Sequence, residues 1–268
     1  MKEIGRNEKC PCMSGKKYKN CCDKTKKWEF FKNHGLSFYD ESYYLKNLLE
    51  QDLCFKSLYF SDRVRIKKPI LFFQSNINIQ AAMSYGTIEN ESYCITSKYS
   101  QLPLSESVHV AHELEHLLLH SEGHKAVSFK DENLNQSIRT HKMLNDMIYD
   151  PMVNKKLINY GYDLISYLKN SDKTQMNLPK IGENIFLVKT LYVKRFLDYK
   201  NIDPNINKNE IDFIKWVQKD YPEVIEDAEN ILKIIDMYGT SSTEQTENSL
   251  INIIKYLKLD DKLKVKLI

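Results

Sequence analysis

The stretch His109-Val-Ala-His-Glu-Leu-Glu-His-Leu-Leu-Leu-His120 decides the fold of this protein. Its apolar residues recur at helical spacing, so one face can pack into a core while the opposite face carries polar side chains. The pattern predicts a helix from Glu106 to about Ser121. Ser105 is the expected N-cap and Gly123 the expected C-terminal stop.

Two histidines of this helix are candidate metal ligands. Residues i and i+4 lie one above the other on a helix, so His112 and His116 can direct two imidazoles at one ion. Glu113 is turned by about 100°, which places its carboxylate where it can take a proton from metal-bound water. This is the chemistry of the HExxH pattern of zinc peptidases. His120 and His124 are weaker ligand candidates, and histidines that merely face solvent or the core are the alternative.

A catalytic zinc also needs a third protein ligand and an open position. Asp146 and Asp150 are spaced i, i+4 on a second helix, predicted from about Glu132 to Tyr149 and interrupted at Pro151. A resemblance to thermolysin-like enzymes implies Asp146 as the metal ligand and Asp150 as the residue that orients a ligand histidine. The reverse assignment stays open. In a further alternative, Asp150 only caps a helix that begins at Pro151.

The stretch from Val108 to His120 resembles the ImmA/IrrE family of metallopeptidase domains. In that family a short sheet precedes such a helix, and an acidic third ligand follows on a later helix. The resemblance covers about residues 62 to 165 and implies a zincin-like core in an intracellular protein. Several members act on or with transcriptional repressors. Glu115 replaces the usual Gly before the second histidine. This change leaves the ligands intact, but the family's substrates are not carried over to this chain.

The N-terminal head carries the second strong motif. Its four cysteines, in the order C-x-C and then C-C, are Cys10, Cys12, Cys21 and Cys22. A turn at Ser14-Gly15 can bring the two pairs together around a tetrahedral ion. Four thiolates leave no open position, so this zinc would be structural and the segment would fold only with its metal. Redox-active thiols or an accidental cluster are the alternative.

This head resembles the SEC-C motif, which is known from the C-terminal tail of the SecA translocation ATPase. Lys9 and Met13 depart from the usual Pro and Gly of the motif, but neither is a ligand. The family's tail contacts the chaperone SecB and the ribosome. The resemblance therefore implies a module that recruits a chaperone, a ribosome or another protein partner.

Charge and composition narrow the class of protein. The chain has 268 residues and a net charge of +3, but residues 1–27 alone carry +6, which leaves −3 for the rest. A basic head can bind an acidic protein or the ribosome and does not exclude nucleic acid; a charged face that only contacts solvent is the alternative. The sequence has neither a signal-peptide pattern nor a membrane-spanning apolar run, so we expect a cytoplasmic protein without a membrane partner. In the cytoplasm, cysteines serve as metal ligands or free thiols more often than in disulfides. Cys54 and Cys94 are expected to be small buried hydrophobes.

The predicted fold class is α+β: a mostly helical, zincin-like metallopeptidase core with a small antiparallel sheet. Strands are expected at residues 69–73, 79–85 and 93–99, and residues 185–268 show helical periodicity. We expect the chain to divide into four parts. They are the SEC-C zinc knuckle (residues 1–24), a helical connector (25–61), the zincin-like peptidase domain (62–168) and a helical C-terminal region (169–268).

These observations predict a zinc-dependent intracellular metallopeptidase that hydrolyses a protein or peptide substrate. It would hold two Zn²⁺ ions, one catalytic and one structural, with Glu113 as general base. The alternative is a regulatory or adaptor protein without proteolytic activity, which keeps the peptidase scaffold and binds its partner through the zinc knuckle.

Overall fold

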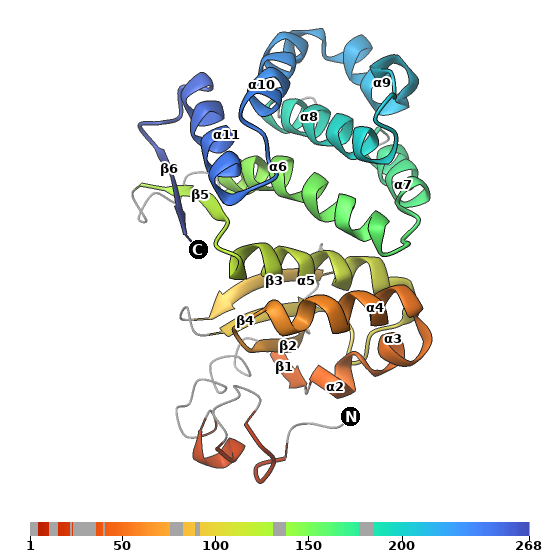
Figure 1. Cartoon of the computed structure of the whole chain (residues 1–268), viewed down its shortest axis with the longest axis vertical. Helices are drawn as coiled ribbons and strands as arrows, with labels where there is room; N and C mark the ends of the chain where they lie inside the picture. Colours follow the sequence, from red (N-terminus) through yellow and green to blue (C-terminus); the bar gives the residue numbers. More distant parts are fainter. Residues whose placement is uncertain are drawn as a thin grey trace. The chain divides into compact units, whose positions relative to one another are not determined.

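The computed structural model describes residues 5–10, 16–21, 23, 36–39, 41–75, 83–88, 92–130, 138–176 and 185–267. The chain forms two compact units, unit 1 (residues 1–121) and unit 2 (residues 122–268). Taken together, the described residues are mostly helical with small sheets, which confirms the predicted α+β class; Figure 1 shows the elements of both units in chain order. The zincin-like identity and the predicted domain boundaries stay predictions.

Unit 1 is built on a mixed four-stranded sheet in the order β1-β2-β4-β3. Its strands are β1 (Leu36–Tyr39), β2 (Ile70–Ser75), β3 (Met83–Ile88) and β4 (Ser92–Ser97). The β2–β4 pair is parallel and the other two pairs are antiparallel. The predicted antiparallel sheet is therefore wrong in this respect. The chain reverses direction twice between β2 and β4, and because β3 lies at the edge, β4 meets β2 running the same way.

Among its described residues, the segment before β2 contains one strand besides its helices. We expected residues 25–60 to be mostly helical, but β1 pairs with β2 and belongs to the sheet. The helices are α2 (Glu41–Tyr44), α3 (Lys46–Gln51) and α4 (Leu53–Asp62), followed by the 3-10 turn η2 (Arg63–Arg65). Asp52 caps α4 by accepting from the backbone N–H of Phe55 at 2.9 Å. Strand pairing of residues 36–39 overrides local helical preference because it completes the edge of the sheet.

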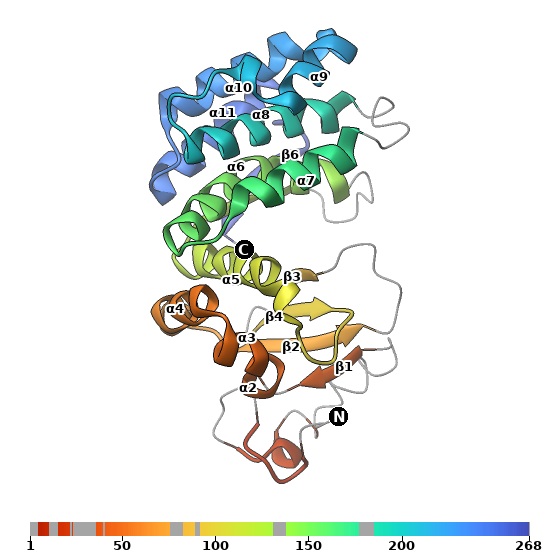
Figure 2. The same ribbon diagram turned by 90° about the vertical axis from the view of Figure 1, so that its right-hand side faces the viewer.

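The predicted histidine helix is present as α5 (Ser107–Ser121). It follows the 3-10 turn η3 (Leu104–Glu106), so Ser105 lies inside that turn and is not the N-cap. Gly123, at φ +90°, follows the end of the helix as expected. The helix packs against α4, β3 and β4, as Figure 2 shows. Its buried apolar stripe consists of Val110, Ala111, Leu114, Leu117 and Leu118.

Unit 2 is a stack of helices beside a two-stranded sheet. Its elements are β5 (Lys125–Phe129), α6 (Ile138–Asn159), α7 (Leu164–Met176), α8 (Ile185–Ile202), η5 (Lys208–Glu210), α9 (Asp212–Asp220), η6 (Pro222–Val224), α10 (Ile225–Tyr238), α11 (Thr243–Tyr256) and β6 (Leu263–Leu267). Helix α8 is central, because it packs on α6, α9 and α10, and α10 packs in turn on α11 (Figure 1).

Helix α6 continues through Pro151, where the sequence predicted an interruption. The alternative in which Asp150 caps a new helix is therefore wrong. A proline inside a helix costs about 3 kcal/mol, but Pro151 lies on a buried stretch that packs against α8. The side chain of Asn201 also donates to the Pro151 carbonyl at 2.8 Å. Tertiary packing thus offsets the local penalty.

The C-terminal region ends in a strand instead of a helix. Strand β6 pairs antiparallel with β5, with Val265 opposite Val127. Helix α11 begins at Thr243, four residues after Gly239, and Ser242 caps it by accepting from the backbone N–H of Gln245 at 3.2 Å. Within the residues described, no helix combines the length and apolar character needed to cross a membrane.

Candidate functional site

The two imidazoles of the predicted ligand pair converge beside α5. The Nε2 atoms of His112 and His116 lie 3.0 Å apart, and the two rings meet nearly edge to face at 72°. His116 is buried and His112 is half-buried. The i, i+4 spacing therefore does what the sequence predicted, since both ring nitrogens point to the same place beside the helix.

This geometry fits a bound metal ion. Zinc binds imidazole nitrogen at about 2.0–2.1 Å with tetrahedral angles, which separates two ligand nitrogens by roughly 3.3 Å. The observed separation of 3.0 Å needs an opening of only a few tenths of an ångström. Small rotations of two side chains about Cβ supply that change without moving the helix backbone.

The two glutamates of the motif have different environments. Glu113, next to His112 in the sequence, is half-buried. Glu115 is fully buried on the packed side of α5. The position at which the ImmA/IrrE resemblance predicts Gly is therefore a buried position in this chain.

Sequence analysis missed a polar cluster one turn before the histidine pair. Nδ1 of His109 lies 3.0 Å from Oε2 of the buried Glu106, and the Tyr99 hydroxyl donates to Oε1 of the same carboxylate at 2.9 Å. The cluster joins the end of the β4 segment to the start of α5. The i, i+3 spacing of Glu106 and His109 was a signal that could have shown the pair, but Tyr99 is brought there only by the fold.

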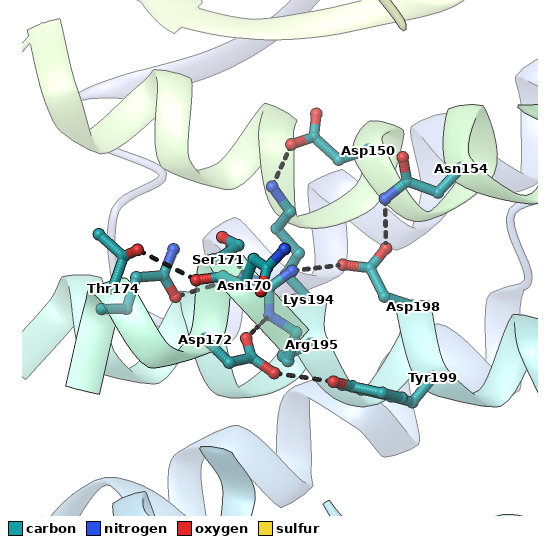
Figure 3. A network of polar contacts seen from close by, with 11 residues as sticks. Asp150, Asn154, Asn170, Ser171, Asp172, Thr174, Lys194, Arg195, Asp198 and Tyr199 are labelled. Carbon is teal, nitrogen blue, oxygen red and sulfur yellow. Dashed lines mark hydrogen bonds and ion pairs between the residues drawn. The ribbon is translucent and has the colours of Figure 1, made fainter. Parts of the chain in front are cut away.

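The candidate third ligands lie on α6 in unit 2. Asp146 is half-buried and Asp150 is buried at 7% exposure. The ammonium of Lys194 on α8 binds Oδ2 of Asp150 (Figure 3). Sequence analysis missed Lys194, because it lies far from the motif in the chain and no local pattern marks it. By residue chemistry, His112, His116 and Asp150 make a set that could hold a metal ion.

Behind Asp150 lies a buried network of charges in unit 2. Arg195 contacts Asp172 through Nε at 2.5 Å and Asp198 through Nη1 at 3.3 Å. The Tyr199 hydroxyl donates to Asp172 at 2.9 Å, and the Asn154 amide donates to Asp198 at 2.8 Å. Figure 3 shows these residues meeting where α6, α7 and α8 pack together.

Burial and pairing shift the pKa values in this network. Burial raises the pKa of Asp172 and Asp198, and the neighbouring cations only partly offset the effect. Burial by itself would lower the pKa of the Lys194 ammonium, but the carboxylates of Asp150 and Asp198 outweigh burial and raise it. Lys194 is therefore held in its charged form.

The cysteine head folds through short-range backbone pairing. Lys9 and Lys17 form an antiparallel bridge, and the backbone N–H of Cys10 donates to the carbonyl of Lys16 at 2.7 Å. The 3-10 turn η1 (Tyr18–Asn20) then leads into Cys21. Cys10 is buried, while Lys9, Lys16 and Lys17 are exposed. Part of the basic charge thus faces solvent beside the cysteines.

The remaining cysteines fall into two groups. Cys12 and Cys22, two of the four predicted thiolate ligands, lie outside the described residues, as does the predicted turn at Ser14-Gly15. Cys54 and Cys94 form no disulfide and are only half-buried, so the prediction that both are buried is wrong. Burial raises the pKa of the Cys94 thiol to about 11, which keeps it protonated at neutral pH and suits the predicted packing role.

Comparison with known proteins identifies the head. Residues 6–23 match the family model of the SEC-C motif. Residues 6–23 are a SEC-C motif. Similar segments occur in the protein translocase subunit SecA of Finegoldia magna, with 72% identity over 25 residues, and of Clostridium kluyveri, with 71% over 24 residues. The subunit from Dehalococcoides mccartyi strain CBDB1 is 78% identical over 23 residues.

These similarities are confined to the SEC-C motif. Each covers 9% of this chain and only 2–3% of the SecA subunit. No solved structure matches the chain. The SEC-C prediction is confirmed, whereas the resemblance to ImmA/IrrE peptidases stays a prediction that rests on the histidine helix.

Proposed function

We propose that this protein is a cytoplasmic zinc-dependent metallopeptidase that its SEC-C motif recruits to a protein partner. The observation that carries the proposal is the convergence of the His112 and His116 Nε2 atoms to 3.0 Å on a buried helix, with Glu113 between them. Two imidazoles and an adjacent accessible carboxylate are the residue types that metal-assisted peptide hydrolysis requires.

We propose Asp150 as the third ligand in preference to Asp146. By residue type, an aspartate added to His112 and His116 gives a set in which each residue offers one ligand atom. It is also the more buried of the two carboxylates and is held by an ion pair, so its side chain has less freedom to lose on binding. Asp146, one turn earlier on the same helix, then lies beside the ion pair.

In this reading the side chains divide the work of hydrolysis. Zinc, when bound, supplies Lewis acidity that polarises the peptide carbonyl and lowers the pKa of a water to about 7. Glu113 takes the proton from the attacking water and delivers it to the leaving amine. The imidazole rings of His112 and His116 are held in place because helix α5 packs against α4, β3 and β4.

The SEC-C motif would hold the second zinc ion and bind the protein partner. Cys10, Cys12, Cys21 and Cys22 are its proposed ligands, and four thiolates suit a closed structural site. Similarity to a protein translocase subunit favours a protein partner, and the exposed lysines of the head favour an acidic surface on that partner.

The proposal is tested by metal content and activity together. Wild-type protein should bind two zinc ions per chain, and the His112→Ala/His116→Ala variant should keep only the SEC-C ion. Glu113→Gln should retain both ions while peptidase activity falls by about 10²–10⁴-fold, the usual contribution of a general base. Unchanged activity in Glu113→Gln with normal zinc content would refute the enzyme.

A second candidate function is an adaptor whose working part is the SEC-C motif. The identity of more than 70% to SecA segments favours it, because that similarity is confined to the motif. Deleting residues 1–24 separates the two functions. The enzyme would keep its intrinsic activity toward a short peptide and lose only recruitment, whereas the adaptor would lose all function.

A further inference from the structure

We infer that the exposed side of α4 and η2 in unit 1 is a docking surface for an acidic amphipathic helix of a partner protein. Three large apolar side chains lie on it, with exposed fractions of 80% for Leu53, 62% for Phe60 and 80% for Val64. We call these three residues the α4 row. The inference does not depend on the proposed zinc site, because His112 and His116 lie on a different helix.

The α4 row follows one side of the helix. Residues seven or eleven positions apart return to the same side of an α-helix, because two turns take about seven residues and three turns about eleven. Phe60, and Val64 in the turn that directly continues α4, therefore lie in line with Leu53 over roughly 16 Å. Phe55 and Leu58 are buried on the opposite side, where α4 packs on α3 and α5 (Figure 2). The row is thus not part of this core.

The exposed apolar surface of unit 1 is concentrated in the α4 row. Among the described residues of this unit, four large apolar side chains are exposed, and three of them form the row. The fourth, Leu104, lies in η3. Single apolar side chains are normal on a protein surface, whereas a contiguous row with a polar rim marks a contact site for another molecule.

The charges beside the α4 row are positive. Nine residues between positions 51 and 67 are exposed, and none of them is acidic. Three of the nine are cations: Lys56, Arg65 and Lys67. The two acids of this segment serve the fold itself, since Asp52 caps α4 and the buried Asp62 pairs with Arg65. A partner with apolar side chains for the row and carboxylates for the lysines would complement this surface.

A helix is the conformation of the partner that fits this surface. The backbone groups of α4 bond within the helix, so a partner is recognised by side chains and not by strand pairing. A partner helix satisfies its own backbone groups in the same way and can present a matching row of apolar side chains. Ser57 and Ser61, which are small and exposed on the same segment, leave room for these side chains.

Two other occupants fit this surface less well. A second copy of this chain would bring like charges together, because the cations beside the row would meet their own counterparts. An anionic membrane would attract the same cations, but helices that lie on a membrane bury a broad apolar face. The α4 row is only one side chain wide, which suits the ridge of a single partner helix.

The test is binding of a fluorescently labelled peptide to the full chain, measured by anisotropy. The acidic peptide forms a helix of about four turns, with a row of leucines and with glutamates on both sides of that row. A second peptide carries lysines in place of the glutamates, and a third has the composition of the first with its leucines scattered around the helix. We expect the acidic peptide to bind about tenfold more tightly than the other two, and its affinity to fall as salt is added.

Variants of exposed residues locate the binding without disturbing the fold. Phe60→Ser/Val64→Ser should weaken binding of the acidic peptide by about tenfold or more. Lys56→Glu/Lys67→Glu should also weaken it and should reverse the preference in favour of the lysine peptide. The matched control is Met237→Ser, which removes an apolar residue of unit 2 that is 77% exposed and should leave the affinity unchanged.

Three results would overturn the inference. Equal binding of the three peptides, or unchanged affinity in Phe60→Ser/Val64→Ser, would mean that the α4 row does not recognise an acidic helix. Sedimentation with phosphatidylserine vesicles that this variant abolishes, without preference for the acidic peptide, would assign the surface to a membrane. A concentration-dependent dimer that this variant abolishes, again without that preference, would assign it to a second copy of the chain.

Discussion

Arg195 provides a direct test of what holds unit 2 together. Its guanidinium is 3% exposed and contacts two carboxylates, Asp172 at 2.5 Å and Asp198 at 3.3 Å. It also donates to Ser171 at 3.0 Å. Arg195→Met keeps much of the side-chain volume but removes the charge, both ion pairs and the hydrogen bond to Ser171. Two buried carboxylates would then lie close together with no guanidinium between them.

The expected loss of stability is large. Removing one partner of a buried ion pair costs about 3–5 kcal/mol, because the charge left behind is neither solvated nor paired. In a domain of this size, each kcal/mol corresponds to roughly 2–4 °C in Tm. We therefore expect Arg195→Met to lower Tm by about 6–20 °C. The same substitution at an exposed arginine such as Arg6 should change stability by less than about 0.5 kcal/mol.

The loss should depend on pH. Burial raises the pKa of Asp172 and Asp198 above the unfolded value of about 3.9, so the folded state binds their protons more tightly. Their protonation therefore adds to the free energy of unfolding as pH falls from the raised folded pKa toward that value. Without Arg195 these pKa values rise further, so the destabilisation caused by Arg195→Met should shrink as pH decreases from 7 toward 4.

Urea unfolding followed by circular dichroism at several pH values measures this effect. Adding Asp172→Asn and Asp198→Asn to Arg195→Met should recover most of the stability at pH 7, since no buried charge then remains unpaired. A loss below about 1 kcal/mol at pH 7, or no recovery in the triple variant, would refute the reasoning that unpaired buried charge governs this region.

Three other predictions follow from single contacts. Tyr99→Phe removes the hydrogen bond to Glu106 and should cost about 1–2 kcal/mol in chemical denaturation; an unchanged midpoint would mean that the contact adds nothing to stability. Leu263→Ala should cost about 2–3 kcal/mol and speed amide exchange in β5, because Leu263 is buried where β6 pairs with β5. Burial lowers the pKa of His124, so the stability of the wild type should fall as pH drops below about 6.5, and His124→Gln should flatten this dependence in melts between pH 5 and 8.

The features that the sequence predicted correctly depend on neighbours along the chain. His112 and His116 converge because four residues make about one helical turn, whatever the rest of the protein does. The SEC-C motif was recognisable for the same reason, since its pairing joins residues within 6–23. The hairpin of β3 and β4 is another local feature, although its strands begin and end a few residues away from the predicted positions.

Contacts between distant segments were beyond the reach of sequence patterns. The parallel pairing of β2 with β4, the pairing of β6 with β5 and the passage of α6 through Pro151 all depend on surfaces that meet only in the folded chain. Local propensities differ by about 1 kcal/mol or less per residue, apart from the penalty of about 3 kcal/mol for a proline inside a helix, and burial of a few apolar side chains outweighs them. The same holds for the candidate site. Residue spacing determined the histidine pair and its glutamate, whereas the packing of α8 on α6 decided that Lys194 meets Asp150. A buried ion pair of this kind forms only where the fold brings both charges out of water together.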